Sequence, residues 1–136
     1  MRTIRTIIID DERLAREELK SLLKNYAEIE IISEAKNGEE GVQLINELNP
    51  DLIFLDVNMP GLSGFDLLKQ LDEIPLVVFV TAYDEYAIKA FEVDALDYML
   101  KPVDPERLND ALKKITARFV EDNIPVETAF TDVQPK

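Results

Sequence analysis

The sequence predicts an α/β protein: five short parallel strands that alternate with helices, (βα)5, in one doubly wound sheet. Short apolar runs alternate with stretches of helical period from one end of the chain to the other. Continuous apolar runs are typical of strands that are covered on both faces, and their alternation with helices favours a parallel sheet. A closed barrel of such units needs about 250 residues, whereas this chain has 136.

The predicted strands are apolar and rich in β-branched residues, and a polar residue follows almost every one of them. The first strand stops at Asp10-Asp11, and the third stops at Asp56. Thr81 follows the fourth strand, and Lys101 follows the last one and precedes a proline. The expected strand ranges are Thr3–Ile9, Ile29–Ala35, Leu52–Leu55, Leu76–Val80 and Ala95–Leu100.

The helices are predicted from apolar residues that recur with a period of about 3.6. Asn49-Pro50 ends the second helix, and Val57–Gly64 is a loop because it contains proline, glycine and serine. Tyr86–Phe91 lies in the expected fourth helix. The apolar positions are Ala15, Leu19, Leu22, Leu23 and Tyr26 in the first helix, Gly41, Leu44, Ile45 and Leu48 in the second, Leu67, Leu68 and Leu71 in the third, and Leu108, Ala111, Leu112, Ile115 and Phe119 in the last.

Composition excludes several classes of function. The chain has no cysteine and no histidine, which excludes disulfides, Cys- or His-ligated metal sites and catalytic triads with a histidine base. Its net charge of −13 disfavours nucleic acid and anionic membranes and suits cations or basic partners. No apolar run approaches the roughly 20 residues of a membrane helix, and the N-terminus does not read as a secretory signal. We therefore expect a cytoplasmic protein without a membrane partner.

Three carboxylates are expected to meet at one edge of the sheet. In the flavodoxin-like strand order 2-1-3-4-5, ligands bind beyond the carboxyl ends of the first and third strands. Asp10 and Asp11 follow the first of these strands, and Asp56 follows the other. Their mutual repulsion requires either that one of them takes up a proton or that a cation neutralises them. Oxygen ligands in a partly hydrated site favour Mg2+.

The next two strand ends add groups that bind a phosphoryl group. The hydroxyl of Thr81 and the ammonium of Lys101 follow the fourth and fifth strands. Phosphoryl transfer requires an in-line nucleophile and positive charge around the phosphoryl oxygens. Asp56 can supply the nucleophile through an acyl phosphate, while the metal and Lys101 supply charge and Thr81 a hydrogen bond.

Four sequence blocks resemble the signatures of response-regulator receiver domains, in order and on four of the predicted strands. They are IIIDDE, IFLDVNMPGLSG, VFVTA and DYMLKP. The longer stretch AFEVDALDYMLKP resembles more specifically the receivers of LytTR-type (LytR/AlgR) transcription regulators of two-component systems. The resemblance covers about residues 3–119.

The resemblance implies a role for each residue of these blocks. Asp56 would be the phosphorylated aspartate, and a sensor histidine kinase would supply the phosphoryl group. The metal would be bound by Asp11 directly, by Asp10 largely through water and by the backbone carbonyl of Asn58. Thr81 and Lys101 would hold the phosphoryl oxygens. In addition, Tyr98 would be the aromatic residue that changes rotamer on activation, and Pro102 would follow a cis peptide bond.

The resemblance also implies an output. We expect residues 1–119 to form the receiver domain and residues 120–136, which lack a periodic pattern, to form a linker or tail. Phosphorylation would promote homodimerisation through the fourth helix, last strand and last helix, where acidic and basic residues are mixed. LytTR-type regulators continue into a DNA-binding domain, so DNA would be bound only through a C-terminal domain outside this chain.

Each candidate residue also has a simpler explanation. Asp10-Asp11 could cap the first helix, and Asp56 could begin a turn. Thr81 could cap the fourth helix, and Lys101 could be an ordinary solvated lysine.

Other functions are compatible with the same residues. A stand-alone phosphorelay receiver would differ only in its output, and a scaffold would leave the acidic pocket idle. A haloacid-dehalogenase-type phosphatase also uses an aspartate nucleophile, Mg2+, a hydroxyl and a lysine. Such an enzyme places an acidic residue two positions after the nucleophile, where this chain has Asn58. We therefore expect a switching module that catalyses only its own phosphorylation and dephosphorylation, rather than an enzyme.

Overall fold

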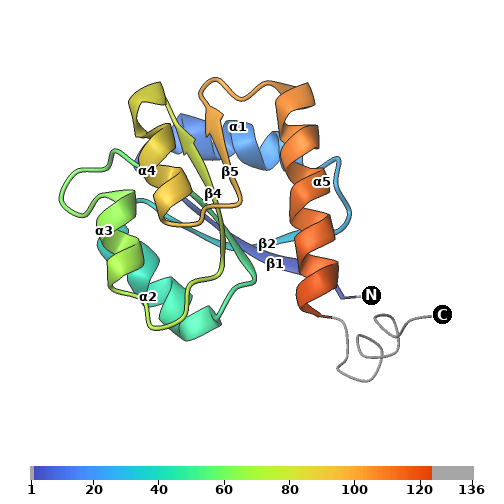
Figure 1. Cartoon of the computed structure of the whole chain (residues 1–136), viewed down its shortest axis with the longest axis horizontal. Helices are drawn as coiled ribbons and strands as arrows, with labels where there is room; N and C mark the ends of the chain where they lie inside the picture. Colours follow the sequence, from blue (N-terminus) through green and yellow to red (C-terminus); the bar gives the residue numbers. More distant parts are fainter. Residues whose placement is uncertain (1, 124–136) are drawn as a thin grey trace.

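The computed structural model describes residues 2–123 and has the expected alternation of strands and helices (Figure 1). A short 3-10 helix, η1 (Asp84–Tyr86), precedes the fourth α-helix. The strands are β1 (Ile4–Ile9), β2 (Ile29–Ala35), β3 (Leu52–Leu55), β4 (Leu76–Thr81) and β5 (Asp97–Leu100). The helices are α1 (Arg13–Leu23), α2 (Gly38–Leu48), α3 (Gly64–Lys69), α4 (Ala87–Glu92) and α5 (Pro105–Asp122).

The five strands form one parallel sheet in the order β2-β1-β3-β4-β5, which confirms the predicted flavodoxin-like fold. The register pairs Ile9 with Leu55, so the residues that follow β1 and β3 leave the sheet at the same level. Likewise Thr81 pairs with Leu100, the residue before Lys101. The pairing therefore brings all the predicted strand-end residues to one edge.

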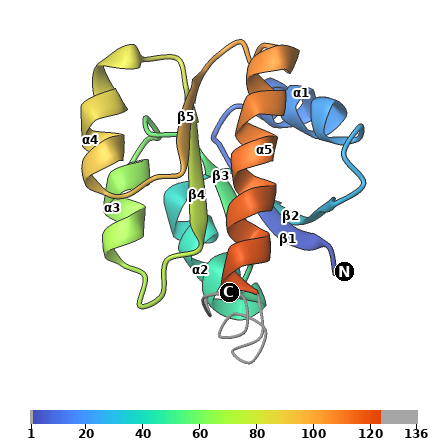
Figure 2. The same cartoon turned by 45° about the vertical axis from the view of Figure 1, so that its right-hand side comes forward.

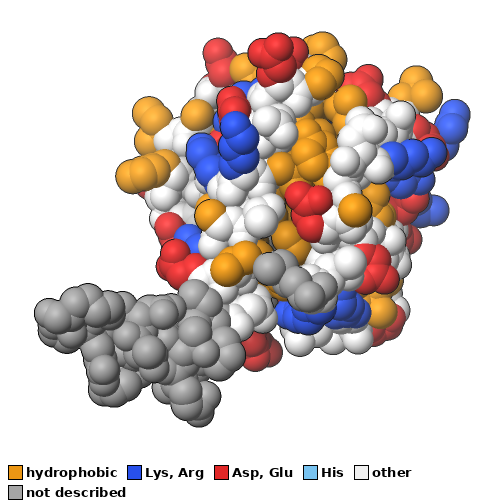
Figure 3. All heavy atoms as spheres, turned by 90° about the vertical axis from the view of Figure 1, so that its right-hand side faces the viewer, with side chains coloured by type: hydrophobic (Ala, Val, Ile, Leu, Met, Phe, Trp, Pro, Cys, Tyr) orange, Lys and Arg blue, Asp and Glu red, His pale blue; other side chains and the backbone are white. Residues whose placement is uncertain are grey.

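Two apolar layers cover the sheet. Helices α1 and α5 lie on one face, and α2, α3 and α4 lie on the other (Figures 1 and 2). Phe54 and Phe79 of the central strands are fully buried, one in each layer. On the side that carries α5, apolar side chains gather in the middle of the surface and charged side chains surround them (Figure 3). No helix within residues 2–123 has the length and apolar character needed to cross a membrane.

Several element boundaries differ from the expected ones. Strand β1 begins at Ile4 rather than at Thr3, and β4 includes Thr81. Helix α1 ends at Leu23, before Tyr26, and α3 includes Gly64 of the expected loop but ends before Leu71. Tyr86 belongs to η1 rather than to α4, and β5 begins at Asp97 rather than at Ala95. Asp94 has a φ of 62°, so the chain turns there before it enters β5. Helix α5 continues to Asp122, past the expected end of the domain at residue 119. The rest of the expected linker or tail, from residue 124 onward, lies outside the described residues.

An ion pair with a buried carboxylate joins β5 to α5. The side chain of Asp97 is only 6% exposed and accepts hydrogen bonds from both terminal nitrogens of Arg107, at 3.0 and 2.5 Å. It also contacts the ammonium of Lys114 at 3.3 Å and accepts from the backbone N–H of Tyr98 at 2.8 Å. Burial alone would raise the pKa of Asp97, but these donors outweigh it and hold the pKa below its usual value.

We predict that Asp97→Asn lowers the free energy of unfolding at pH 7 by about 2 kcal/mol, the range for hydrogen bonds to a charged group. A carboxyl whose pKa is depressed by folding stabilises the fold above its unfolded pKa of about 3.9. The difference from wild type should therefore vanish as the pH falls below 4 and through the folded pKa. Urea unfolding between pH 7 and pH 3 measures it, with Glu121→Gln, at an exposed position of the same helix, as control. A pH-independent loss would contradict the ion-pair explanation.

Candidate functional site

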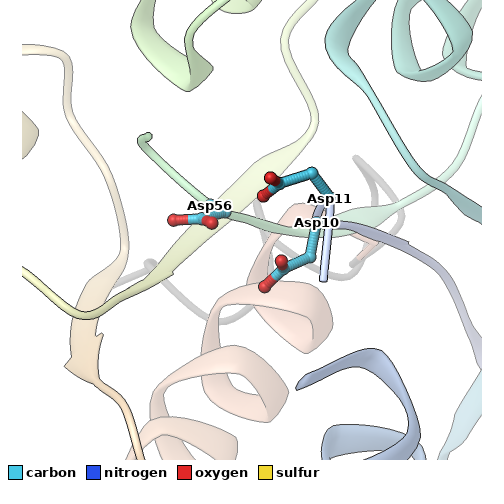
Figure 4. Close-up of side chains that lie close together, drawn as sticks. All are labelled: Asp10, Asp11 and Asp56. Carbon is cyan, nitrogen blue, oxygen red and sulfur yellow. The ribbon is translucent and has the colours of Figure 1, made fainter. Parts of the chain in front are cut away.

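The ends of β1 and β3 bring three carboxylates together. Asp10, Asp11 and Asp56 each place one oxygen within 4.8 Å of the others. Their side chains come from neighbouring strand ends and turn toward a common space (Figure 4). Asp10 and Asp56 are each only 5% exposed, whereas Asp11 is exposed. The convergence that the strand order predicted is therefore present.

A tight loop fixes the backbone of Asp56. The N–H of Gly64 donates to the carbonyl of Val57 at 2.9 Å, which folds the loop back onto the end of β3. A Cβ atom at Gly64 would lie 2.4 Å from the carbonyl oxygen of Asp56, so only glycine fits there. Within the loop, the backbone N–H of Asn58 donates to Oδ1 of Asp56 at 3.3 Å. The loop thereby holds the Asp56 carboxylate from the backbone side.

Lys101 enters the site from the loop after β5. Its ammonium lies 2.8 Å from Oδ2 of Asp10 and 3.3 Å from Oδ2 of Asp56. The side chain is 15% exposed, and the Lys101–Pro102 peptide bond is cis. The lysine is thus an internal counter-charge for two buried carboxylates and not a solvated side chain.

Burial governs the charge of this cluster. Burial raises the pKa of Asp10. Hydrogen bonds from Lys101 and from the backbone of Glu12 lower this pKa, but they offset the effect of burial only in part. Burial and the neighbouring Asp10 carboxylate together raise the pKa of Asp56. For Lys101, burial alone would lower the pKa, but hydrogen bonds to Asp10 and Glu12 reverse this and raise it above its usual value. The lysine is therefore charged at neutral pH. Ionisation of the two buried carboxylates remains less favourable than it would be in water.

The hydroxyl of Thr81 is buried without a partner. Thr81 is 0% exposed, and among the described residues its Oγ1 has no hydrogen-bond partner. A buried hydroxyl without a hydrogen bond is unfavourable, so such groups are normally paired. The hydrogen-bonding capacity of this hydroxyl, at the end of β4, is therefore unused within the described residues.

Tyr98 lies on β5, next to the strand that carries Thr81. Its hydroxyl donates to the carbonyl oxygen of Tyr83, in the loop after β4, and its ring centroid lies 6.3 Å from that of Phe79. Burial raises the pKa of its hydroxyl. The side chain is half-buried and connects β5 to the loop between β4 and η1.

Glu12 is a site residue that the sequence interpretation missed. Its Oε1 lies 2.7 Å from the Lys101 ammonium, although its side chain is 63% exposed. The signal was its position directly after Asp10-Asp11, which makes it the third consecutive acidic residue. Nothing in the sequence indicates that it would contact a lysine 89 residues away.

The structure also tests whether Asp10, Asp11 and Thr81 simply cap helices. Glu12, not Asp10 or Asp11, occupies the N-cap of α1, and no side chain caps that helix. The N-cap of α4 is Tyr86 and the position before η1 is Tyr83, and neither helix has a side-chain cap. Thr81, whose hydroxyl makes no hydrogen bond within the described residues, therefore does not cap the fourth helix.

A hollow opens beside the carboxylates, between α1 and the loop after β5. Its volume is about 340 Å3, and its walls combine charged and apolar groups. Asp10, Asp56 and Lys101 line one side, and Leu14 and Leu19 of α1 line another. Leu14 is 74% exposed, so the rim of the hollow is apolar and accessible. Asp56 thus lies in the wall of a hollow whose rim is exposed.

Comparison with protein families gives one match. The model of the response regulator receiver domain matches residues 6–113, which include every strand-end residue described above.

Curated relatives share about half of their sequence with this chain where they align. The transcriptional regulatory protein BtsR of Escherichia coli (strain K12) is 47% identical over 114 residues, which are 82% of this chain and 48% of BtsR. The sensory transduction protein LytT of Bacillus subtilis (strain 168) is 51% identical over 114 residues, 82% of this chain and 47% of LytT. The chain thus spans about half the length of these relatives.

Solved structures show the same fold. The REC domain of AraT, a response regulator from Geobacillus stearothermophilus, superposes with a TM-score of 0.82 at 31% identity, over 90% of this chain and 99% of that one. The response regulatory domain of mrkE from Klebsiella pneumoniae superposes with a TM-score of 0.80 at 36% identity, over 87% of this chain and 99% of that one.

Proposed function

This chain belongs to the family of response regulator receiver domains, and from that premise we propose that Asp56 accepts a phosphoryl group from a sensor histidine kinase. The domain is the receiver of a two-component response regulator related to LytT and BtsR. Receiver domains are typically not enzymes acting on other substrates. We infer that this one catalyses only the gain and loss of its own phosphoryl group.

The observation that carries the proposal is the position of Asp56. Its carboxylate is buried at the end of β3, with the Lys101 ammonium 3.3 Å away. In the proposed step, an Asp56 oxygen attacks the phosphorus of the donor, and the bond between phosphorus and the donor's leaving atom breaks. Lys101 and the unpartnered hydroxyl of Thr81 then bind phosphoryl oxygens.

The carboxylate cluster also fits a divalent cation. Asp10, Asp11 and Asp56 each place one carboxylate oxygen within 4.8 Å of the others, and the backbone carbonyl of Asn58 would provide a further ligand. Such hard oxygen ligands suit Mg2+, which would neutralise charge on the transferred phosphoryl group when it is bound. Asp11, which is exposed, would bind the metal directly. Asp10 would contact it largely through water, because its two oxygens already contact the Lys101 ammonium and the backbone N–H of Glu12, each at 2.8 Å.

We propose that Thr81 and Tyr98 form the switch. A phosphoryl group on Asp56 adds acceptor oxygens, and the Thr81 hydroxyl, which lacks a partner, would move toward them. In this structure the Tyr98 hydroxyl donates a hydrogen bond to the carbonyl of Tyr83, in the loop that follows Thr81. A shift of this loop would break the hydrogen bond and let the Tyr98 ring turn inward. This movement would change the surface of α4 and β5.

The kinase would reach Asp56 through the hollow beside α1, in the cytoplasm. Leu14 is exposed at the rim of the hollow, where a docking helix of the kinase would cover it. Because the chain itself has no histidine, the phosphohistidine donor must come from the partner.

The output would be homodimerisation through α4, β5 and α5. The sequence suggested that mixed charges drive this association, but Arg107 and Lys114 are already paired within the chain to Asp97. Exposed apolar side chains on α4 are a better source of affinity: Ile88 is 78% exposed and Phe91 is 85% exposed. Dimerisation would bring together two DNA-binding domains that lie outside this chain.

Phosphoryl transfer from a small donor tests the proposal. Incubation with Mg2+ and phosphoramidate or acetyl phosphate should add one phosphoryl group, about 80 Da, as an acyl phosphate. Chelation of Mg2+ should prevent this gain, and p-nitrophenyl phosphate should not be turned over repeatedly. The absence of a mass gain with either donor, or many turnovers of the aryl phosphate, would overturn it.

A further inference from the structure

We propose that Glu12 is a positioning residue whose contact with the Lys101 ammonium competes with a phosphoryl group at Asp56, and so limits the rate at which Asp56 is phosphorylated. This inference rests on the proposed function of Asp56. It assigns a role in the phosphorylation site to a side chain outside the set of strand-end residues that the sequence predicted.

Three carboxylates surround the Lys101 ammonium, which has three N–H donors and no acceptor. It donates hydrogen bonds to Glu12 at 2.7 Å and to Asp56 at 3.3 Å, and it forms an ion pair with Asp10 at 2.8 Å. The longest of the three contacts is the one to Asp56. The ammonium is drawn toward the other two carboxylates.

The backbone places Glu12 beside the site. Glu12 occupies the N-cap of α1, and its side chain makes no capping hydrogen bond there, so the carboxylate can turn toward Lys101. Its backbone N–H donates to Oδ1 of Asp10 at 2.8 Å, which fixes the start of the side chain beside the site. The carboxylate then contacts the Lys101 ammonium at 2.7 Å, and both residues line the hollow.

The consequence concerns the phosphoryl group. When a phosphoryl group arrives at Asp56, it needs the Lys101 charge near its own oxygens. Lys101 must then give up one of its carboxylates. Glu12 is the only one of the three on an exposed side chain, so it can be released into water at the smallest cost. Until that release, the Glu12 contact competes with the incoming group for Lys101.

The test compares two substitutions at the same position. Glu12→Gln removes the charge, whereas Glu12→Asp keeps the charge but is one methylene too short to reach Lys101. With saturating Mg2+ and phosphoramidate, both variants should be phosphorylated about fivefold faster than wild type, the change expected from the loss of one partly exposed ion pair. Glu18→Gln is the matched control, because Glu18 lines the same hollow from α1 without a contact to Lys101.

A second readout needs no phosphoryl transfer. In the metal-free protein, hydrogen exchange of the Lys101 ammonium, followed by 15N NMR, should be faster in Glu12→Gln and Glu12→Asp than in wild type or Glu18→Gln. Unchanged exchange in both Glu12 variants would overturn the inference even if wild type is phosphorylated. A rate increase in Glu12→Gln but not in Glu12→Asp would also overturn it, since charge repulsion of the donor would then explain the effect. Faster exchange in a protein that takes up no phosphoryl group would instead refute the proposed function.

Discussion

Asp56→Asn should take up no phosphoryl group from phosphoramidate or acetyl phosphate, at any Mg2+ concentration. The amide that replaces the carboxylate is a far weaker nucleophile and cannot form the acyl phosphate. Intact-mass measurement after incubation with Mg2+ provides the test. The fold should remain stable. The substitution removes the negative charge of Asp56, whose ionisation is unfavourable because the carboxylate is buried and lies next to Asp10.

Asp11→Asn is the matched control for that experiment. It also removes one carboxylate from the cluster, but it leaves the proposed nucleophile in place. We expect slower phosphorylation that recovers as Mg2+ is raised, since the loss is one of metal affinity. Labelling of Asp56→Asn at the wild-type level would show that another residue is the acceptor. Complete and Mg2+-independent loss in Asp11→Asn would show that the two aspartates are not separated into metal ligand and nucleophile.

The sheet could be predicted because its signals are local. The strands are short and mostly apolar, and the polar residues at the ends of β1, β3 and β4 also mark the edge of the site. The start of β5 was harder to place. Ala95 and Leu96 are apolar, but the turn at Asp94 keeps them outside the strand. An apolar run alone does not show where strand geometry begins.

The region around α4 was less predictable for a different reason. Ile88 and Phe91 suggest a helix with an apolar buried face, yet both are exposed. Helical periodicity reports which residues are apolar, not whether the fold covers them. Tyr86 shares the same apolar pattern but lies in a 3-10 turn, which the period cannot distinguish over so few residues.

One part of the site could be predicted from the sequence, and another part could not. The convergence of Asp10, Asp11 and Asp56 follows from strand order, so the sequence predicts it. The contact between Glu12 and Lys101 depends on the conformations of two side chains that are 89 residues apart in sequence, and no rule of sequence spacing predicts it. The ion pair between Asp97 of β5 and Arg107 of α5 likewise depends on how α5 packs against the sheet.

Lys101→Ala should lower the free energy of unfolding by about 3 kcal/mol in metal-free solution at pH 7, because removal of one partner leaves buried charges uncompensated. The carboxylates of Asp10 and Asp56 are 7% and 6% exposed, and Lys101 is the cation that contacts both within residues 2–123. Urea unfolding followed by circular dichroism measures the loss. Lys36→Ala is the control, because Lys36 is exposed and follows β2 at the same edge of the sheet. It should change stability by less than about 0.5 kcal/mol.

Two dependences separate this electrostatic loss from a loss of packing. The pKa values of Asp10 and Asp56 are already raised by burial, and loss of the lysine raises them further. A carboxyl with a raised folded pKa destabilises the fold above that pKa, and the penalty is relieved as the pH falls through it. The loss of unfolding free energy in Lys101→Ala should therefore shrink as the pH falls from 7 toward the raised pKa values.

Mg2+ should also stabilise the variant more than wild type, because it restores the missing positive charge and no longer competes with an ammonium for the same oxygens. A deficit that responds to neither acid nor Mg2+ would mean that Lys101 contributes through its aliphatic chain, and the description of the site as a charge cluster balanced by one lysine would be wrong.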